Sequence, residues 1–329
     1  MKHIKTVLTA ITILIFVVTG TAFAQDNGAT YTVGILNLYP ELGNAVVGFK
    51  DGMDELGYVE GENITYVYDE TLPFGELDQD EIIEAAQALV DADVDLLFAS
   101  SGDEAAILME LTSDIPIVFS LSSDPVGVGL VESLTEPGGN ATGIETGGFH
   151  ERRLQLMVEI DPTIAKVYYP YYPEGTGAED MLQGLLETAE DLDIELVIAE
   201  FTDVDSVQAA IEDIPDDIDA IFFSPEGLLF QFFPDWVGVS MQLQAGISIP
   251  AYMPMPGVLM GYGPDPSTGG QQASKIVDRI LMGADPSDMP VQSAEYFLMV
   301  NLETAMAIDL DISRGILRQA NMIVRPGEQ

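Results

Sequence analysis

Short apolar stretches alternate with longer segments of helical spacing along the first half of the chain. The short stretches are rich in β-branched and aromatic residues, as is typical of strands, whereas apolar residues recur every three or four positions in the longer ones. This pattern predicts strands over 30–38, 63–70, 95–101, 115–121 and 140–146, and helices over 42–56, 78–92, 103–113 and 126–134.

The same alternation restarts after the glycines at 147–148. It predicts helices over 151–160, 177–190, 205–213 and 227–243, and strands over 166–172, 195–201, 220–225 and 247–253. A tail follows, with a strand over 258–265, a helix over 271–283, and a strand and short helix within 295–310. Two successive arrays predict an α/β protein with two open, mostly parallel sheets flanked by helices. The long tail indicates that the chain crosses between the two lobes more than once.

Two polar residues mark expected helix starts at the edge of the first sheet. Asp124 precedes a proline and the run VGVGLVESL, which favours Asp124 as the N-cap of a helix over 126–134. Ser101 and Glu104 have the spacing of a capping box. Capping alone explains Ser101. The alternative is that the same helix start receives a ligand carboxylate, although the neighbouring acidic side chains argue against a strongly anionic ligand.

The first residues differ in character from the rest of the chain. A basic start, MKHIK, precedes the apolar run TVLTAITILIFVV, and Ala22-Phe23-Ala24 matches a signal-peptidase cleavage site. We expect residues 1–24 to be a secretory signal peptide that is cut before Gln25. An uncleaved N-terminal anchor is the alternative, but the apolar run is short for a membrane span. No cysteine follows to carry a lipid anchor, so we expect a periplasmic or extracellular protein.

Charge and composition exclude several classes of function. Without residues 1–24 the chain carries 9 basic and 55 acidic residues, a formal charge of −46, which excludes a general nucleic-acid binder. The chain has no cysteine, and His150 is its one histidine after the signal, so neither a thiol enzyme nor a metal cluster of cysteines or histidines is available. The motifs GxSxG, HExxH, GxGxxG and the Walker loop are absent. We therefore expect no catalytic residues, no metal and no cofactor.

Ligands of open parallel sheets bind beyond the carboxyl ends of the strands. In the first lobe these ends are expected to carry Asn37, Tyr39, Ser100, Ser101, Ser123 and Asp124, and in the second lobe Tyr171, Tyr172 and Glu226. Two such edges that face each other predict a cleft lined with hydroxyl and aromatic groups. For the tyrosines the alternative is core packing, because successive strand residues point to opposite faces of the sheet.

Several long segments carry a specific resemblance. The chain resembles the substrate-binding proteins of ABC importers, the family that includes tryptophan- and tyrosine-type binding proteins, in GFKDGMDELGYVEGENITYVY (48–68), IPIVFSLSSDPVGVGLVESLTEPGGNATGIET (115–146), RRLQLMVEIDPTIAKVYYPYYPE (152–174), LMGYGPD (259–265) and VDRILMGADPSDMPVQSAEYFLMVNLETAMAIDLDI (277–312). The resemblance implies a two-lobed periplasmic-binding-protein fold, type I-like, with a hinge. Its N-terminal lobe would span 25–146 plus about 258–284, and its C-terminal lobe 147–257 plus about 285–329.

The resemblance also implies which residues face the ligand. The ligand-facing loops of the family fall on Asn37, Ser100, Ser101, Ser123, Asp124, Thr146, Tyr171, Tyr172 and Glu226. The chain departs from the family pattern at 102–104, where Gly-Asp-Glu replaces small apolar residues, and at the tyrosine pair, where the family often has Tyr-Asn. Because these positions decide the ligand, the resemblance does not fix which ligand is bound. The Ser, Tyr and Phe residues near the strand ends, with no basic residue beside them, favour a small amphipathic ligand, such as an amino acid.

The implied partners are an ABC permease in the membrane and its cytoplasmic ATPase. The protein would bind its ligand as a monomer by hinge closure and deliver it to the permease. Two alternatives remain: a ligand-sensing protein that serves a signalling receptor, and a secreted hydrolase, which would depend entirely on His150.

Overall fold

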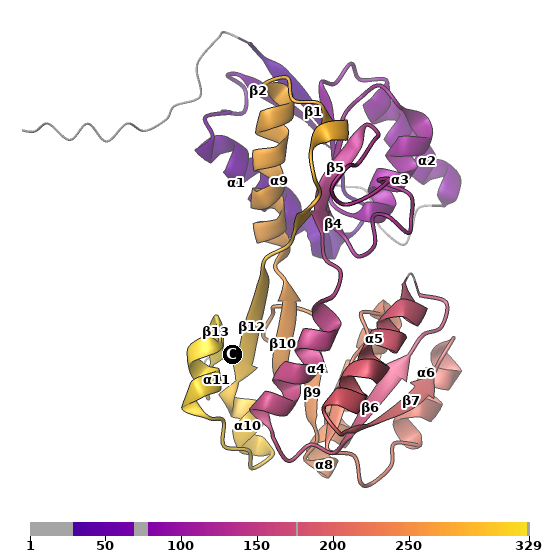
Figure 1. The fold of residues 1–329 in the computed structure, drawn as a ribbon, viewed down its shortest axis with the longest axis vertical. Coiled ribbons are helices and arrows are strands. Elements are labelled where there is room, and N and C mark those ends of the chain that lie inside the picture. The colour runs from indigo at the N-terminus through magenta and orange to yellow at the C-terminus, as the bar shows by residue number, and fades with distance from the viewer. Residues whose placement is uncertain (1–28, 69–77, 176, 328–329) are drawn as a thin grey trace, which may run out of the picture.

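The computed structural model describes residues 29–68, 78–175 and 177–327, so the expected signal peptide 1–24 lies outside the described residues. The molecule has two lobes joined at a narrow waist, and each lobe holds one sheet between layers of helices (Figure 1). The prediction of an α/β protein with two mostly parallel sheets is confirmed.

The sheet of the first lobe has six strands in the order β11-β5-β4-β3-β1-β2, and every pairing is parallel. Its strands are β1 (Tyr31–Leu36), β2 (Ile64–Tyr68), β3 (Leu96–Ala99), β4 (Ile117–Ser122), β5 (Ala141–Glu145) and β11 (Gln292–Ser293). Helices α1 (Gly43–Glu55) and α9 (Pro266–Leu281) cover one face, and α2 (Gln79–Val90) and α3 (Gly102–Leu111) cover the other. Two short 3-10 helices are η1 (Pro40–Leu42) and η2 (Pro286–Asp288).

The sheet of the second lobe has seven strands in the order β13-β12-β10-β9-β8-β6-β7. They are β6 (Lys166–Tyr171), β7 (Glu195–Glu200), β8 (Ala220–Phe222), β9 (Gly246–Ile249), β10 (Val258–Pro264), β12 (Tyr296–Asn301) and β13 (Met322–Val324). The pair β10 and β12 is antiparallel and the other pairs are parallel.

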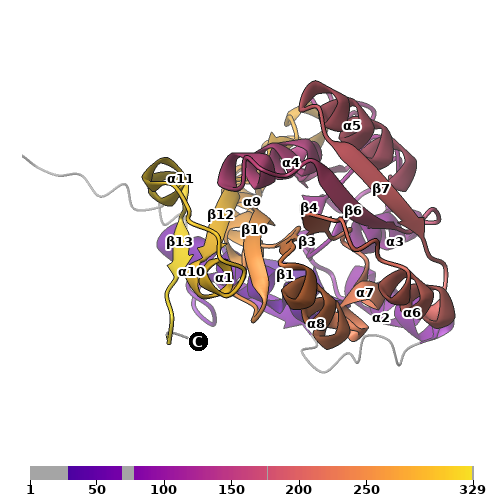
Figure 2. The same ribbon diagram turned by 90° about the horizontal axis from the view of Figure 1, so that it is seen from below.

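Helices cover both faces of this second sheet (Figure 2). On one face lie α4 (Phe149–Ile160), α5 (Ala178–Asp191), α10 (Leu302–Ala307) and α11 (Arg314–Gln319). On the other lie α6 (Val204–Glu212), α7 (Gly227–Gln231) and α8 (Phe233–Leu243). Because helices cover both faces of the central strands, the sequences of these strands are largely apolar throughout and do not alternate between apolar and polar residues.

Three segments connect the lobes. The chain leaves the first sheet between β5 and α4, returns between β10 and α9, and leaves again between β11 and β12. The lobe boundaries therefore differ from the expected ones. The expected N-terminal lobe includes about 258–284, but β10 lies between β9 and β12 in the second sheet, while α9 packs on α1 in the first lobe. The expected C-terminal lobe includes about 285–329, but β11 pairs with β5 of the first sheet.

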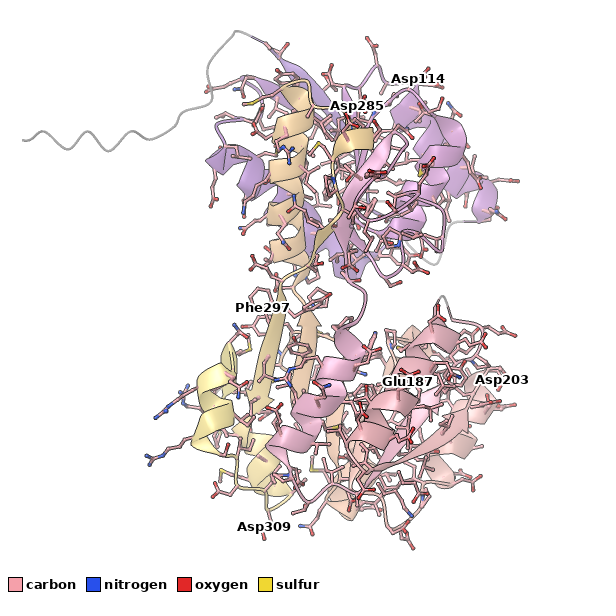
Figure 3. The ribbon with its side chains drawn as sticks, in the orientation of Figure 1. Asp114, Glu187, Asp203, Asp285, Phe297 and Asp309 are labelled. Atoms are coloured by element: carbon pink, nitrogen blue, oxygen red, sulfur yellow. The ribbon has the colours of Figure 1, made fainter. Side chains whose placement is uncertain are left out.

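Aromatic rings surround these connections. The ring of Tyr296 stacks on Phe149 with centroids 5.4 Å apart and lies 5.9 Å from the ring of Tyr262. Phe297, which Figure 3 shows at the waist, packs on Tyr252 with a centroid distance of 5.1 Å. At the waist, the three connecting segments are therefore accompanied by aromatic rings that pack against one another.

The expected helix over 126–134 does not form. Turns follow β4 instead: the Val128 N–H donates to the carbonyl of Asp124, and Gly129 has a positive φ of 78°. The Asp124 side chain accepts from the Gly127 N–H at 2.7 Å and closes a turn, so its expected role as a helix N-cap is wrong. Two glycines within three residues lower the helix propensity, and alternating Val-Gly gives the segment no apolar helix face.

Among the described residues, no helix is both long and apolar enough to cross a membrane. Acidic side chains lie on both lobes, as the labelled Asp114 and Asp285 on one and Glu187, Asp203 and Asp309 on the other illustrate (Figure 3). The negative charge is thus spread over the molecule.

Candidate functional site

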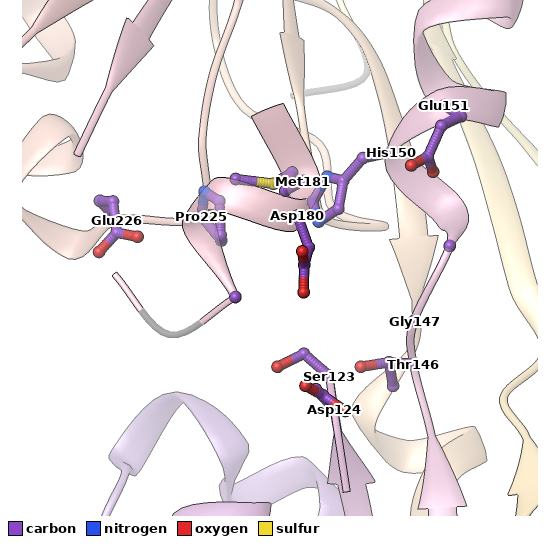
Figure 4. A pocket seen from close by; sticks show the side chains of 12 residues that line it. Ser123, Asp124, Thr146, Gly147, His150, Glu151, Asp180, Met181, Pro225 and Glu226 are labelled. Carbon is purple, nitrogen blue, oxygen red and sulfur yellow. The ribbon is translucent and has the colours of Figure 1, made fainter. Parts of the chain in front are cut away.

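A cavity of about 260 Å³ lies between the lobes (Figure 4). Its lining residues come from both sides of the waist: Ser123, Asp124, Thr146, Gly147, Gly148, His150, Glu151, Gly177, Asp180, Met181, Pro225 and Glu226. Loops after β4, β5, β6 and β8 contribute, so the cavity lies where the carboxyl ends of the two sheets face each other.

The wall from the first lobe is polar. Ser123 and Asp124 follow β4, and Thr146 follows β5 at the point where the chain crosses to the second lobe. The Thr146 N–H donates to the Ser122 carbonyl at 2.7 Å, which keeps the two strand ends together as the sheet stops. The Ser123 side chain is exposed and remains available to a ligand.

The wall from the second lobe is made largely by the first turns of two helices. His150 and Glu151 belong to the first turn of α4, and Asp180 and Met181 to that of α5. The N-cap residues are Gly148 and Gly177, with φ of 74° and 69°, and no side chain caps either helix. Glycine adopts this left-handed conformation without the clash that a Cβ introduces. Two uncapped helix starts therefore border the cavity.

Carboxylates dominate the cavity. Asp124, Glu151, Asp180 and Glu226 line it, and no lysine or arginine is among the described residues that do. Burial raises the pKa of the Glu226 carboxyl. Burial also lowers the pKa of the His150 imidazole well below its usual value, and the nearby Arg153 cation lowers it further. His150 is therefore neutral at physiological pH, and its Nδ1 is buried without a hydrogen-bond partner among the described residues.

Arg153 lies one helical turn beyond His150 and is fully buried. Its guanidinium stacks over the Phe222 ring at 3.7 Å and donates to the Phe223 carbonyl. Nε and Nη1 have no partner among the described residues. Burial lowers the pKa of Arg153 to about 9. An unpaired cation is thus held behind the second-lobe wall of the cavity.

Four of the sequence-predicted residues meet in the cavity: Ser123, Asp124, Thr146 and Glu226. Three others form a buried network around Glu104 in the first lobe instead. Ser100 Oγ lies 2.6 Å from Glu104 Oε2 and 2.7 Å from Asn37 Oδ1, and the Ser101 N–H donates to Glu104 at 2.8 Å. Ser101 and Glu104 form the reciprocal capping box of α3.

The three predicted tyrosines lie outside the cavity lining. Tyr39 donates from its hydroxyl to Asp103 at 3.1 Å. Tyr171 is 6% exposed and packs in the core beneath α4 and α5, which argues against direct contact with a ligand. Tyr172 stacks on Phe201 and donates to Glu174.

Sequence reasoning missed Glu151, Asp180 and Met181, and it considered His150 only as the residue on which a hydrolase would depend. The strand-end rule directed attention to the last residues of strands, whereas these side chains lie one loop later, at the starts of the following helices. Two glycines could have pointed to these helix starts in the sequence. Gly148 and Gly177 directly precede two helices that lack a Ser, Thr, Asp or Asn residue at the N-cap.

Comparison with known proteins identifies the family. Residues 34–324 match the family model described as ABC transporter substrate binding protein. The chain belongs to this family. A tyrosine-binding protein of Clostridioides difficile is 26% identical over 289 residues, which cover 87% of this chain and 83% of that protein.

Solved structures of substrate-binding proteins and related molecules share the fold. A conserved domain protein from Vibrio cholerae matches with a TM-score of 0.73 and 26% identity, over 90% of this chain and 99% of that one. A domain from Streptococcus pneumoniae in complex with L-Trp matches with a TM-score of 0.70 and 21% identity, over 89% and 99%. A ligand-free, open substrate-binding protein from Clostridium difficile matches with a TM-score of 0.76 and 22% identity, over 90% and 99%.

The part of the chain that the structure describes contains no arranged metal-binding site. No group of three or more His, Asp or Glu residues there is placed to hold a metal ion. The four cavity carboxylates come from separate elements and do not form such a group.

Proposed function

We propose that this protein is the extracytoplasmic solute-binding component of an ABC importer. It binds a small ligand, an amino acid, in the cavity between its lobes, closes around it by bending at the three connecting segments, and delivers it to a permease coupled to a cytoplasmic ATPase. The observation that carries this proposal is the placement of the cavity: both lobes line it, so a bound ligand favours the closed arrangement.

The choice of an amino acid rests on the relatives. One curated relative is named a tyrosine-binding protein, and one structural relative was crystallised with L-Trp. The cavity of about 260 Å³ carries both hydroxyl and charged groups, which suits a small molecule with polar ends. Residues 1–24 act as the signal peptide in this proposal, and the protein works as a monomer outside the cytoplasm.

Binding without catalysis is part of the proposal. A Ser-His-Asp hydrolase needs a carboxylate that orients the histidine. Nδ1 of His150 has no hydrogen-bond partner among the described residues, which argues against that role.

Isothermal titration calorimetry of the protein from Gln25 onward tests the proposal. The twenty amino acids are titrated first, with ribose, glucose and adenosine as comparison ligands. We expect saturable one-to-one binding of one or more amino acids and none of the sugars. Binding of a sugar or nucleoside alone would show that the amino-acid assignment is wrong.

A further inference from the structure

The layer between helix α4 and the second sheet contains a buried cation without a counter-charge. Arg153 of α4 is fully buried, its guanidinium lies 3.7 Å from the centre of the Phe222 ring, and one of its nitrogens donates to the Phe223 carbonyl. No carboxylate of the described residues forms an ion pair with it, and Nε and Nη1 have no hydrogen-bond partner there. A guanidinium so placed needs acceptors for its free N–H groups and a negative charge nearby.

The hydroxyl of Tyr169 is the first neighbour of this cation. Tyr169 of β6 and Phe222 of β8 pack in the same apolar cluster as α4, with ring centroids 6.0 Å apart. The Tyr169 hydroxyl is buried and has no hydrogen-bond partner among the described residues. Burial raises the pKa of this hydroxyl, and the nearby Arg153 cation opposes the rise only in part. The hydroxyl is therefore neutral, so it offers a donor to the layer but no negative charge.

Two serines face the same layer from neighbouring strands. Ser248 of β9 pairs with Phe222 and follows Ile247, whose side chain packs on the opposite face of the sheet, so Ser248 points toward α4. Ser224 lies two residues after Phe222, where the alternation returns to the α4 side. Both serine hydroxyls are buried, and neither has a partner among the described residues. The unpartnered polar atoms thus gather around the guanidinium on one face of the second sheet.

The chemistry of these groups selects an anion. The guanidinium has only N–H donors, and each hydroxyl can donate as well. A buried water molecule could accept such bonds, but it would leave the positive charge uncompensated. The surrounding layer is otherwise a closely packed apolar cluster, so a monatomic anion, which occupies the least space, fits it better than an oxyanion does.

We propose that Arg153 binds a chloride ion between α4 and the second sheet, with the hydroxyls of Tyr169, Ser224 and Ser248 donating the remaining hydrogen bonds. None of these four residues lines the cavity between the lobes, so this site is separate from the cavity and goes beyond the proposed function. The ion is a structural part of the second lobe. It neutralises the buried cation and stabilises the packing of α4 on the sheet, whereas without chloride the guanidinium keeps its full cost.

Urea unfolding in matched salts measures this stabilisation. The protein from Gln25 onward is unfolded in sodium gluconate, whose anion is too large for the site, and chloride then replaces gluconate stepwise. Total ionic strength stays at about 0.5 M, where the screening length is about 4 Å in every mixture. We expect a saturable rise in stability. At chloride about ten times its dissociation constant, the ratio of folded to unfolded protein at a given urea concentration should be about tenfold higher.

Variants separate the site from general salt effects. Arg153→Met should abolish the chloride response, and Tyr169→Phe should weaken chloride binding by about tenfold, because it removes one hydrogen bond to the ion. Arg152→Met and Tyr168→Phe are the matched controls and should keep the full response, since Arg152 is partly exposed and Tyr168 donates to the Ala210 carbonyl on the opposite face of the sheet. An equal chloride response in the wild type and in Arg153→Met would overturn the proposal.

Bromide locates the ion directly in the wild-type protein. Crystals grown with sodium bromide in place of chloride are measured at the bromine absorption edge, where bromide scatters anomalously and water does not. We expect an anomalous peak within hydrogen-bond distance of the Arg153 guanidinium. Ordered water there without an anomalous peak would show that the site holds no anion. Either result leaves the calorimetric test of amino-acid binding unaffected.

Discussion

The hydroxyl of Tyr296 donates a hydrogen bond of 3.1 Å to the carbonyl oxygen of Gly147. Gly147 lies in the connection between β5 and α4, and Tyr296 is the first residue of β12, directly after the connection from β11, so the bond joins neighbouring parts of the hinge. Burial raises the pKa of the Tyr296 hydroxyl to about 12, with the charge of Glu145 as a second cause. The hydroxyl therefore stays protonated and able to donate throughout the physiological pH range.

Removal of this hydroxyl tests the hinge bond. Tyr296→Phe keeps the ring that stacks on Phe149 and is expected to lower the free energy of unfolding by about 1 kcal/mol, the net contribution of one such bond. Urea denaturation measures the change. Tyr262→Phe is the control, because that hydroxyl has no hydrogen bond within the described residues. Equal effects of the two substitutions would contradict a specific role for the Tyr296 bond.

The buried carboxyl of Glu104 makes the stability of the first lobe depend on pH. Burial raises its pKa, and hydrogen bonds from Leu38, Ser100 and Ser101 oppose the rise only in part. Because the folded pKa lies above the unfolded value of 4.5, the folded state binds the proton more tightly. The contribution of this proton to stability is complete below pH 4.5 and is lost as pH rises through the folded pKa.

Glu104→Gln measures this effect. The amide resembles the protonated carboxyl but has a single acceptor oxygen, so either the Leu38 N–H or the Ser101 N–H loses its acceptor, and we expect the variant to be less stable by about 1 kcal/mol near pH 4. That deficit should shrink toward pH 7, because only the wild-type side chain ionises. Urea titrations at both pH values check the trend, and a deficit that grows with pH would contradict the raised pKa.

The unpaired guanidinium of Arg153 is predicted to cost stability. Burial lowers its pKa to about 9, so its penalty is complete below pH 9 and declines as pH rises toward the unfolded pKa of 12.5. Arg153→Met keeps an unbranched apolar chain, and we expect it to raise the free energy of unfolding at pH 7 by about 1–2 kcal/mol. The control is Arg152→Met, which removes a partly exposed ion pair with Glu159 and a hydrogen bond to Gln155. A large loss of stability in Arg153→Met would show that the cation stabilises the fold.

Helices α1 and α9 pack so closely that we expect a glycine at their contact to tolerate no larger side chain without a loss of stability. A Cβ on Gly270 would lie 2.0 Å from the backbone oxygen of Ala45, and backbone cannot move aside as a flexible side chain can. Gly270→Ala is expected to lower the midpoint of urea unfolding by an amount equivalent to about 1–3 kcal/mol. Gly43→Ala, where a Cβ meets no atom within 4 Å, is the control and should change little.

The helices and strands with a regular apolar pattern were predictable from the sequence. A strand that is buried on both faces of a sheet needs a continuous run of apolar residues, and a helix that covers a sheet needs an apolar face. The helix over 78–92 and the strand over 115–121, for example, correspond to α2 and β4 within a few residues. The segment 126–134 was not predictable from apolar content, because its glycines and the side chain of Asp124 favour turns.

Long-range pairing explains the remaining differences. That β10 belongs to the second sheet and β11 to the first depends on pairings with β12 and β5, which local pattern does not encode. The rule that ligands lie beyond strand ends led to Ser123, Asp124, Thr146 and Glu226, which line the cavity. Tyr171 could not be placed from the sequence, because a strand position leaves either face of the sheet open, and its ring lies in the core. Whether these cavity residues contact ligand stays a prediction.

Small-angle X-ray scattering tests closure of the lobes around a ligand most directly. The protein from Gln25 onward is measured alone and with saturating L-tyrosine, L-tryptophan or whichever amino acid binds most tightly by calorimetry. We expect a smaller radius of gyration with the ligand, because a molecule bound by both walls of the cavity holds the lobes together. An unchanged radius of gyration at proven saturation would contradict it.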